Sequence, residues 1–459
     1  MADIDVDVLV IGWGKGGKTL AGALGRKGRS VALVEQSTAM YGGSCINIAC
    51  IPTKDLVHSA SERRPEDDPQ AWFTTAVAGR DALTEKLRAR NHAMLAEVDT
   101  VTLIDGHARF TGAHEVQVSA GEDTLTVHAE AIIINTGTAP AEPRFPVESS
   151  RVFDSTTIQH VDPLPQRLVV IGGGYVGLEF AGMFSKFGSQ VTLIDHGDTF
   201  MRNEDRDVAD AARTLLEETG VQIILGGDVR SIRDEAGSTT VALAVGDQSR
   251  TLTTDAVLVA VGRRPVTAEL GLATAGVAVD ERGYVVVDDR LRTSVPHIFA
   301  VGDVNGGPQF TYISLDDNRI VMDQLDGSGV RSTTDRMAVP YTVFLTPPLG
   351  RVGMNEAQAR ESGRRVLVAS KPIADIAAMP RPKIVGETHG LIKLLIDADT
   401  DLVLGAAVFS IDAQEVINLV ALAMRHDVTA AELRDSIWTH PSSTEALNEV
   451  LAARHPLGS

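Results

Sequence analysis

The only two cysteines of this 459-residue chain, Cys45 and Cys50, lie five residues apart in one short segment, GGSCINIACIPTK. The thiolate is the reactive form of cysteine, and a helix N-terminus or a positive charge favours it. The segment is predicted to offer both, because it reads as a helix start and Lys54 follows Cys50 by four residues. This spacing is about one and a half helical turns, so only a distorted helix brings both sulfurs within bonding distance. The pair predicts redox chemistry or the binding of a soft metal ion.

Two glycine-rich patterns predict nucleotide-binding elements. DVLVIGWGKGG (7–17) and RLVVIGGGYVG (167–177) are apolar runs that turn into a glycine series and then a helix-like segment. In each copy the next predicted strand ends in an acid, Glu35 in the first and Asp195 in the second. The glycines are Gly12, Gly14 and Gly17 in the first copy and Gly172, Gly174 and Gly177 in the second. The two copies have the same internal spacing and are 160 residues apart.

Each glycine position has a physical role in such a pattern. The first permits a tight turn, the second lets a pyrophosphate approach the backbone, and the third lets helix and strand pack closely. The pyrophosphate then lies at the helix N-terminus, and the acid accepts a hydrogen bond from a ribose hydroxyl. One such pattern is weak evidence, whereas two in complete strand–helix–strand context predict two bound dinucleotides. Two dinucleotides on one chain indicate electron transfer between them.

Charge and hydropathy exclude several classes of partner. The net charge is −19, which repels the phosphate backbones of nucleic acids and anionic lipid head groups. We therefore expect no nucleic acid partner and no membrane association. The apolar stretches are short and interrupted, and the N-terminal MADIDVDVLV reads as a strand and not as a signal peptide. A cytoplasmic location is expected.

The remaining chain predicts strands over 101–136 that end at IIINTG, then HIFAVGDV, where Asp303 follows a buried strand. From about residue 336 strands and helices mix without a nucleotide signature. The predicted fold is α/β, with two Rossmann-like (three-layer ββα) dinucleotide-binding domains. The last segment, from about residue 336, is the candidate partner-binding domain.

Taken together, these motifs resemble the class I flavoprotein pyridine nucleotide-disulfide reductases. The resemblance rests on the C-x4-C pair ending in P-T-K, both glycine patterns, the VGRRP turn, FAVGDV and HPSSTE, and it covers nearly the entire chain. It implies an oxidoreductase that uses FAD and NADH or NADPH, acts as a homodimer and needs no metal. It also implies the domain boundaries: 1–150 for the first part of the FAD-binding domain, 151–268 for the NAD(P)-binding domain, 269–335 for the central FAD-binding part and 336–459 for a C-terminal α+β dimerisation domain. Such an enzyme passes electrons from the nicotinamide through FAD to a disulfide and on to a small substrate.

The resemblance also implies roles for single residues. Cys45 and Cys50 would form the redox-active disulfide, with Cys50 facing the flavin and Cys45 facing the substrate. His440 and Glu445, at the H-P-x-x-x-E spacing, would be the acid–base pair contributed by the other subunit.

Further roles concern the cofactors. Lys54 and Glu179 would form an ion pair near the flavin N5, and Tyr175 would be the movable ring that covers the flavin face. The residues expected to bind FAD are Gly12, Gly14, Gly17, Glu35, Gly43, Ser44, Lys54, Thr136, Gly137, Asp303 and Thr311. Those expected to bind the nicotinamide dinucleotide are Gly172, Gly174, Tyr175, Gly177, Asp195 and Gly262. Asp195 favours NADH, because it would repel a 2′-phosphate.

The stretches MYGGSCINIACIPTK, QFTYISLDDNRIV and FLTPPLGRVGMNEAQARESG are similar to the reactive-chlorine-resistance branch, which is related to mercuric reductase. That branch is associated with reduction of hypothiocyanous acid and of Cu(II), and we expect such an oxidant to be the substrate here. Mercuric reductase is disfavoured, because the C-terminal RHPLGS carries no cysteine pair. The alternatives are a dihydrolipoyl dehydrogenase, a reductase of low-molecular-weight disulfides, a flavin and thiol redox sensor, and a protein that binds Cu(I) through its cysteines.

Overall fold

The structure is a computed structural model that describes residues 2–235 and 237–458. The chain divides into two compact units, which are described separately. The first unit comprises Met1–Leu56, Thr74–Glu142 and Val261–Arg336. The second unit comprises Val57–Phe73, Pro143–Ala260 and Met337–Ser459.

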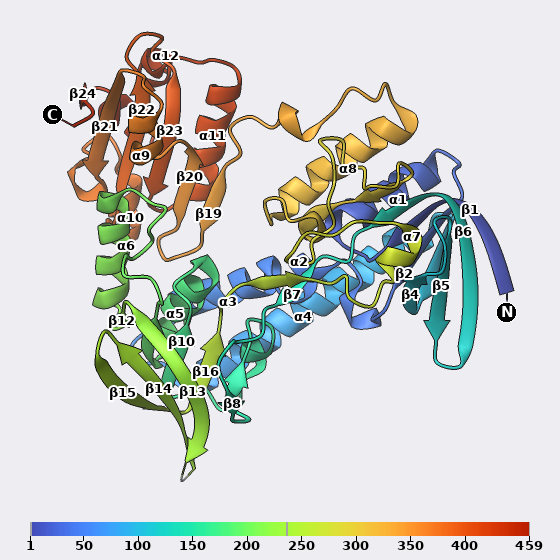
Figure 1. Ribbon diagram of the computed structural model, residues 1–459. Helices are drawn as coiled ribbons and strands as arrows, with labels where there is room; N and C mark the ends of the chain where they lie inside the picture. Colours follow the sequence, from blue (N-terminus) through green and yellow to red (C-terminus); the bar gives the residue numbers. More distant parts are fainter. Residues whose placement is uncertain (1, 236, 459) are drawn as a thin grey trace. The chain divides into compact units, whose positions relative to one another are not determined.

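The first unit is built on a seven-stranded sheet with the order β3-β2-β1-β6-β5-β4, in which β18 also pairs with β6 (Figure 1). Its strands are β1 (Ala2–Ile11), β2 (Val31–Glu35), β3 (Val101–Asp105), β4 (His107–Phe110), β5 (Glu115–Ala120), β6 (Asp123–Ile134) and β18 (Ile298–Ala300). β1 runs parallel to both neighbours, β2 and β6. All five residues of β2 are buried, because helices and loops cover both faces of a parallel sheet. The parallel strands end at one edge of the sheet, where the nucleotide-binding loops are predicted.

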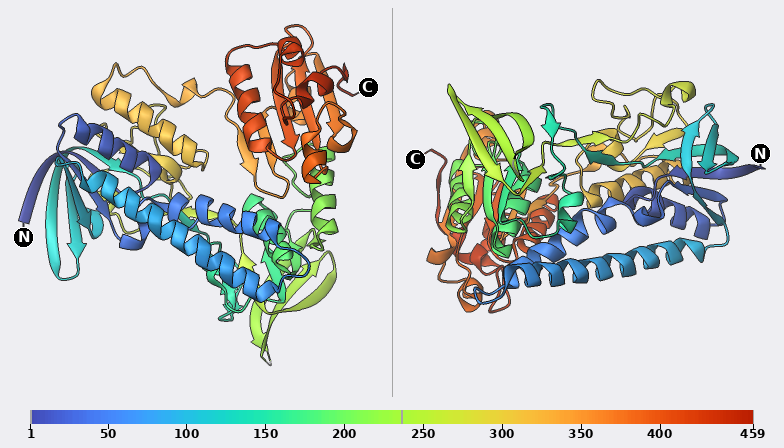
Figure 2. Two further views of the ribbon diagram at one scale, coloured as in Figure 1. Left: turned by 180° about the vertical axis from the view of Figure 1, so that it is seen from behind. Right: turned by 90° about the horizontal axis from the view of Figure 1, so that it is seen from below.

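Helices and short elements complete the first unit. They are α1 (Lys15–Arg26), η1 (Thr38–Met40), α2 (Ser44–Asn47), β7 (Thr138–Pro140), β17 (Arg263–Pro265), α7 (Leu272–Ala275), η3 (Gly302–Asn305), α8 (Thr311–Asp326) and η4 (Thr333–Asp335). α1 and α8 lie side by side (Figure 2). α3 (Cys50–Glu62) and the 28-residue α4 (Pro69–Ala96) contribute residues to both units.

The second unit contains a parallel five-stranded sheet of order β12-β11-β10-β16-β9. Its strands are β9 (Val152–Phe153), β10 (Arg167–Ile171), β11 (Gln190–Ile194), β12 (Gln222–Ile224) and β16 (Ala256–Val259), and its helical elements are η2 (Thr157–His160), α5 (Tyr175–Phe187) and α6 (Arg206–Glu218). A four-stranded sheet of order β15-β14-β13-β8 follows, made of β8 (Val147–Glu148), β13 (Gly227–Glu235), β14 (Ser238–Val245) and β15 (Gln248–Thr254). β10, α5 and β11 form the second predicted strand–helix–strand element.

The C-terminal part of the second unit is an α+β arrangement around a six-stranded sheet, β19-β20-β23-β22-β21-β24. The strands are β19 (Tyr341–Val343), β20 (Leu349–Gly353), β21 (Val366–Pro372), β22 (Leu391–Asp397), β23 (Val403–Phe409) and β24 (Arg454–Pro456). The helices are α9 (Glu356–Glu361), η5 (Ile373–Asp375), α10 (Arg381–Val385), α11 (Ala413–Arg425), α12 (Ala430–Asp435) and α13 (Ala446–Val450). α11 packs on β20 and β23 and buries Val416, Ile417 and Val420 in a shared core (Figure 1).

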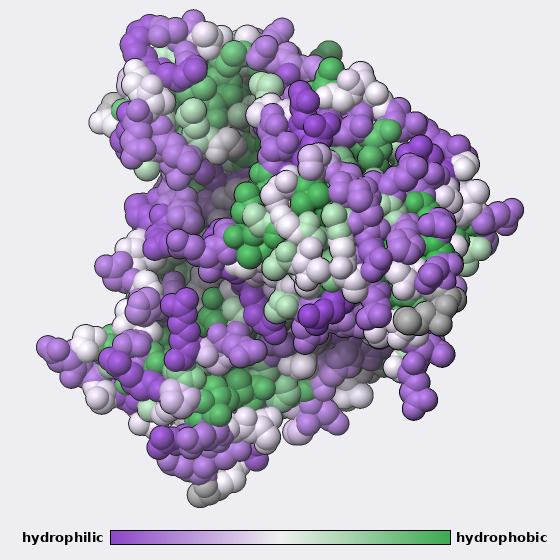
Figure 3. Space-filling view, turned by 45° about the vertical axis from the view of Figure 1, so that its right-hand side comes forward, coloured by the Kyte–Doolittle hydropathy of each residue, from purple (hydrophilic) through white to green (hydrophobic). Residues whose placement is uncertain are grey.

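The sheets and helices agree with the predicted fold class, because a mixed sheet in the first unit and a parallel sheet in the second each carry a strand–glycine loop–helix element and an α+β region follows. The predicted domain boundaries stay a prediction. Hydrophilic residues cover much of the face seen in Figure 3. Over residues 2–235 and 237–458, we find no helix with the length and apolar character needed to cross a bilayer.

Candidate active site

The first glycine loop, Gly12 to Gly17, connects β1 to α1, and three of its glycines pack closely on Asn135. Gly12 has a φ of +99°, and a Cβ there would lie 2.5 Å from the carbonyl oxygen of Asn135. A Cβ on Gly14 or Gly17 would lie 2.7 or 2.6 Å from the Asn135 amide nitrogen. Asn135 in turn donates a 3.1 Å hydrogen bond to the Gly12 carbonyl. Only glycine fits these positions, because the loop lies directly on the end of β6.

The N-cap residue of α1, Gly14, offers no side-chain cap, and the Ser314 hydroxyl accepts a 2.9 Å hydrogen bond from the Gly16 backbone N–H. The other backbone N–H groups of the first turn are suited to bind an anion. Glu35, at the end of β2, is buried, and its carboxylate accepts hydrogen bonds from the backbone N–H groups of Trp13 (3.1 Å) and Ser37 (3.2 Å). Burial raises the pKa of the Glu35 carboxyl. Such a helix start beside a fixed acid fits the pyrophosphate and ribose of FAD.

The cysteine segment, residues 42–54, is held against this loop. Gly43 has a φ of +81°, and a Cβ there would lie 2.8 Å from the Cα of Gly14. α2 begins at Ser44 and is only four residues long, and α3 begins at Cys50. The predicted distorted helix is therefore two helices separated by a break. The break rotates Cys50 toward Cys45, which a regular helix would not allow.

The structure holds Cys45 and Cys50 as two free thiols whose sulfurs are hydrogen-bonded to each other. This hydrogen bond lowers the pKa of Cys50 to about 6, and Thr311 and the positive charge of Lys54 lower it further, against the effect of burial. The Thr311 hydroxyl lies 3.4 Å from the Cys50 sulfur. The same hydrogen bond, together with burial, raises the pKa of Cys45 well above its usual range. The reduced pair thus carries one proton, on Cys45, and one negative charge, on Cys50.

Asp303 lies in η3, next to the end of β6. Its carboxylate accepts a 3.1 Å hydrogen bond from the Thr138 hydroxyl, which accepts one of 2.7 Å from Nε of Arg263. Burial raises the pKa of Asp303, and the nearby Arg263 charge opposes that shift. A buried carboxylate with acceptor capacity left fits the hydroxyl groups of a ribityl chain.

Three other residues predicted to bind a cofactor are Thr136, Gly137 and Gly262. The Thr136 hydroxyl donates to the Val266 carbonyl at 2.7 Å. Gly137 and Gly262 have φ values of +68° and +126°, and a Cβ on either would meet nothing within 4 Å. Open space in front of the backbone is what a bound cofactor requires.

The second glycine loop, Gly172 to Gly177, connects β10 to α5. Gly172 has a φ of +116°, and a Cβ on Gly177 would lie 1.9 Å from the Gly172 carbonyl oxygen, so the third glycine is sterically required. A Cβ on Gly174 would meet nothing within 4 Å, and α5 has no side-chain cap. Asp195 follows β11 directly, and its carboxylate lies against Gly173. The backbone N–H groups at the start of α5 and the carboxylate of Asp195 fit the pyrophosphate and ribose of a nicotinamide dinucleotide, as the corresponding groups of the first loop fit FAD.

Tyr175 and Glu179 both lie on α5, one turn apart. The Tyr175 hydroxyl donates a 2.8 Å hydrogen bond to Glu204, and Glu179 accepts a 2.8 Å hydrogen bond from the backbone N–H of Phe344. The ion pair between Lys54 and Glu179 stays a prediction, because these two residues belong to different units.

His440 and Glu445 form a pair in the loop before α13. Nδ1 of His440 lies 2.6 Å from one oxygen of Glu445, and the other oxygen accepts a 2.6 Å hydrogen bond from the backbone N–H of Ser442. The His440 side chain is 71% exposed and that of Glu445 is 13% exposed. The hydrogen bonds from His440 and Ser442 lower the pKa of Glu445, although burial alone would raise it. A carboxylate fixed in this way orients the imidazole and leaves Nε2 free to exchange a proton.

Sequence reasoning missed Lys18 and Asn135. Lys18 lies in α1, is 5% exposed, and donates to the Gly42 carbonyl (2.9 Å) and to the Asn91 side chain (2.6 Å). Burial, together with the charge of Lys15, lowers the pKa of Lys18 to about 8. For Lys18, the signal in the sequence was a lysine at a position that the helical pattern places on the buried face of the first helix. For Asn135, the signal was a polar residue at the end of an apolar strand.

Comparison with known proteins agrees with this geometry. Residues 6–317 match the family described as pyridine nucleotide-disulphide oxidoreductase, and residues 339–451 match the dimerisation domain of that family. The chain is 45% identical to the probable pyridine nucleotide-disulfide oxidoreductase RclA of Escherichia coli K12, over 97% of this chain and 98% of that protein. It is 33% identical to the dihydrolipoyl dehydrogenase of Haloferax volcanii, over 98% of this chain and 96% of that protein.

A solved structure, the Cu(II) complex of the HOCl-induced flavoprotein disulfide reductase RclA from Escherichia coli, superposes with a TM-score of 0.93. The match covers 98% of this chain and 99% of that chain at 45% identity. The predicted family, fold class, enzyme class and cofactors are confirmed. The chain belongs to the pyridine nucleotide-disulphide oxidoreductase family and is a flavoprotein enzyme that uses FAD and NAD(P)H.

Proposed function

We propose that this enzyme oxidises NADH and uses the Cys45–Cys50 pair to reduce a small oxidant, hypothiocyanous acid or a related species. The observation that carries the proposal is the geometry of the pair: Cys45 and Cys50 are free thiols hydrogen-bonded to each other, and the Cys50 sulfur lies 3.4 Å from the Thr311 hydroxyl. This arrangement lowers the pKa of Cys50 and raises that of Cys45, which favours a thiolate at Cys50 and a thiol at Cys45. A pair with one stable thiolate and one protonated sulfur is prepared for two successive displacements at sulfur.

When bound, FAD would supply the electron pair that reduces the disulfide, and Cys50 is the sulfur of the pair that would face it. Cys45 then loses its proton, and its thiolate attacks the sulfur of hypothiocyanous acid. A Cys45–SCN bond forms, the S–O bond breaks, and the leaving hydroxide takes up the proton as water. The Cys50 thiolate next attacks the Cys45 sulfur, forms the Cys45–Cys50 disulfide and releases thiocyanate.

Cys45 needs a base, because its pKa is raised by the hydrogen bond to Cys50 and by burial. We assign this task to His440 of the partner subunit, oriented by Glu445 of the partner subunit. The match of residues 339–451 to a dimerisation domain supports a homodimer. The proton then passes from Cys45 through the imidazole to the leaving hydroxide.

The choice of oxidant rests on the relatives. The solved structure with 45% identity is a Cu(II) complex of an HOCl-induced flavoprotein disulfide reductase. We propose that this chain likewise acts against oxidants derived from reactive chlorine, and Cu(II) is a second candidate acceptor. The 33% identity to a dihydrolipoyl dehydrogenase makes lipoamide the acceptor to test against them.

A panel of NADH-oxidation assays tests the proposal, with hypothiocyanous acid, Cu(II), oxidised lipoamide and small disulfides as acceptors. We expect repeated turnover with hypothiocyanous acid, and a fall in kcat of at least about 10³ in Cys45→Ser. Turnover with lipoamide alone contradicts the assigned oxidant. Full activity of Cys45→Ser contradicts the thiol mechanism, and a single stoichiometric reduction without turnover identifies a redox sensor.

A further inference from the structure

The Tyr175 hydroxyl is hydrogen-bonded to Glu204, and the role predicted for Tyr175 does not explain this interaction. Glu204 accepts hydrogen bonds on the same carboxylate oxygen from Tyr175 (2.8 Å) and from Tyr341 (2.7 Å). The two hydroxyl oxygens are 3.3 Å apart, and the two rings stack with centroids 5.7 Å apart and planes inclined by 26°. One carboxylate oxygen therefore positions two aromatic rings from separate elements, α5 and β19.

Glu204 is itself fixed on its other side. Its second carboxylate oxygen lies 2.8 Å from Nε of Arg351, in an ion pair whose side chains are 1% and 4% exposed. A buried charge pair is costly to break, because either ion would be left uncompensated away from water. Glu204 consequently has little freedom to follow a moving tyrosine.

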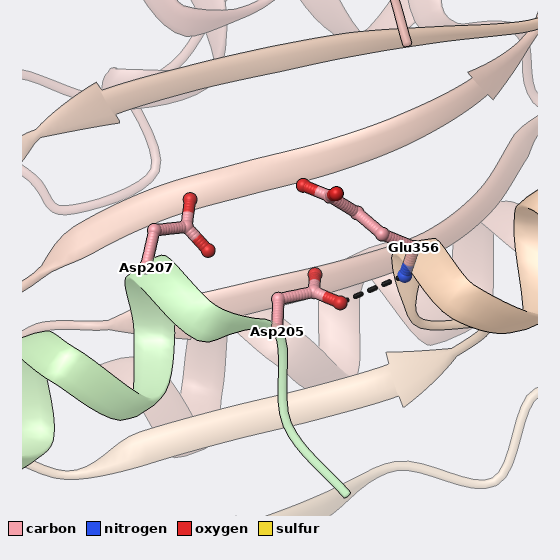
Figure 4. A group of neighbouring side chains, drawn as sticks. All are labelled: Asp205, Asp207 and Glu356. Carbon is pink, nitrogen blue, oxygen red and sulfur yellow. Dashed lines mark hydrogen bonds between the residues drawn. The ribbon is translucent and has the colours of Figure 1, made fainter. Parts of the chain in front are cut away.

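The residue after Glu204 is also held in place. Asp205 accepts a 2.7 Å hydrogen bond from the backbone N–H of Glu356, as Figure 4 shows, and lies 3.5 Å from the buried ammonium of Lys393. Lys393 also pairs with Asp207 and Glu356, so the three acids drawn in Figure 4 share one internal cation. The segment before α6 is thus anchored to α9 and β22, and the acceptor for Tyr175 is rigid.

Both tyrosines keep their protons in this environment. Burial, reinforced by the negative charge of Glu204, raises the pKa of Tyr175 and of Tyr341. Each hydroxyl therefore acts as a donor to a charged acceptor, which is among the stronger kinds of hydrogen bond in proteins. Loss of one hydroxyl leaves the packing of its ring largely unchanged.

We propose that Glu204 and Tyr341 are positioning residues that set the position of the Tyr175 ring and, through it, the affinity for the nicotinamide dinucleotide. Tyr175 is the first residue of α5, directly after the uncapped Gly174 where the pyrophosphate is expected. The inference rests on the role that the family resemblance implies for Tyr175, namely that its ring moves when the nicotinamide enters. A ligand that needs another ring position has to break the bonds to Glu204, so the two events are thermodynamically coupled.

A double-mutant cycle on the oxidised FAD-containing enzyme tests this coupling. The variants are Tyr341→Phe, Tyr175→Phe and the double variant, and the readout is the Kd for NAD⁺ by calorimetry, which needs no turnover. We expect Tyr341→Phe to change this Kd by at least about threefold when Tyr175 is present. In the Tyr175→Phe background the same change should alter it by less than about 1.5-fold, because the shared acceptor no longer connects the rings.

Glu204→Gln, which keeps the size of the side chain and removes its charge, should shift the Kd in the same direction as Tyr341→Phe. Tyr284→Phe is the matched control, since its hydroxyl lies 3.2 Å from the Gln309 side chain in the other unit, and it should leave the Kd unchanged. Additive effects in the cycle, or an unaltered Kd in Tyr341→Phe, overturn the proposal. Neither result depends on which oxidant the enzyme reduces, so failure of this inference is distinct from failure of the proposed function.

Discussion

The thiol of Cys45 donates a hydrogen bond to the sulfur of Cys50, and this contact places the negative charge of the reduced pair on Cys50. It explains how two cysteines of one short segment acquire different chemistry. Cys50 is a thiolate at neutral pH, suited to exchange electrons with the flavin. Cys45 stays protonated until a base acts on it.

The first prediction concerns the pKa of Cys50, which is lowered to about 6 chiefly by Cys45. In the reduced enzyme, alkylation of Cys50 by iodoacetamide should therefore follow a titration near pH 6. Cys45→Ala removes the hydrogen bond, and the midpoint should rise by at least about one pH unit. Mass spectrometry of the alkylated peptide over pH 5 to 9 gives the midpoint. Thr311→Val is the matched control with a smaller rise, and an unchanged midpoint in Cys45→Ala would disprove the assigned cause.

The second prediction concerns the subunit that supplies the base. His440→Asn should lower kcat by about 10² to 10⁴ while leaving flavin binding intact. If His440 acts in the partner, mixed dimers of His440→Asn and Cys45→Ser chains contain one complete site. Random reassociation should then restore about a quarter of the wild-type activity, since half of the dimers are mixed and each has one working site. No recovery on mixing would show that His440 acts within its own chain.

The third prediction is a pH dependence of stability caused by Lys18. Its pKa is lowered from 10.5 to about 8, so between these pH values the unfolded chain binds more protons than the folded chain. Stability should therefore rise with pH through this window, by roughly 3 kcal/mol at most. Lys18→Met removes the titrating group. The melting temperature of the wild type, measured relative to that of the variant, should therefore rise from pH 8 to pH 10. The exposed Lys27→Met serves as control and should run parallel to the wild type.

The fourth prediction concerns nucleotide choice. Asp195 follows β11 and faces the second glycine loop, where its charge should repel the 2′-phosphate of NADPH. We expect kcat/KM for NADH to exceed that for NADPH by at least about tenfold. Asp195→Asn should lower this NADH-to-NADPH ratio, and it should lower kcat/KM for NADPH less than kcat/KM for NADH. A wild-type preference for NADPH would refute this role and direct attention to the exposed Arg202.

The sequence alone determined the features that depend on neighbours along the chain. A strand, a glycine turn and a helix start within about ten residues, so Gly12 to Gly17 and Gly172 to Gly177 were recognisable without any tertiary contact. The cysteine pair and the His440–Glu445 spacing are local for the same reason. These motifs were sufficient for the family, the fold class and both cofactors.

The tertiary structure decided what depends on residues far apart in sequence. The hydrogen bond between the sulfurs requires a break between α2 and α3, and a helical pattern does not show where a helix will break. Asn135 lies beneath the first glycine loop only because β6 pairs with β1. Glu204 accepts hydrogen bonds from Tyr175 and Tyr341, which are 29 and 137 residues away from it in the sequence. No local pattern encodes such contacts, because the packing of separate elements creates them.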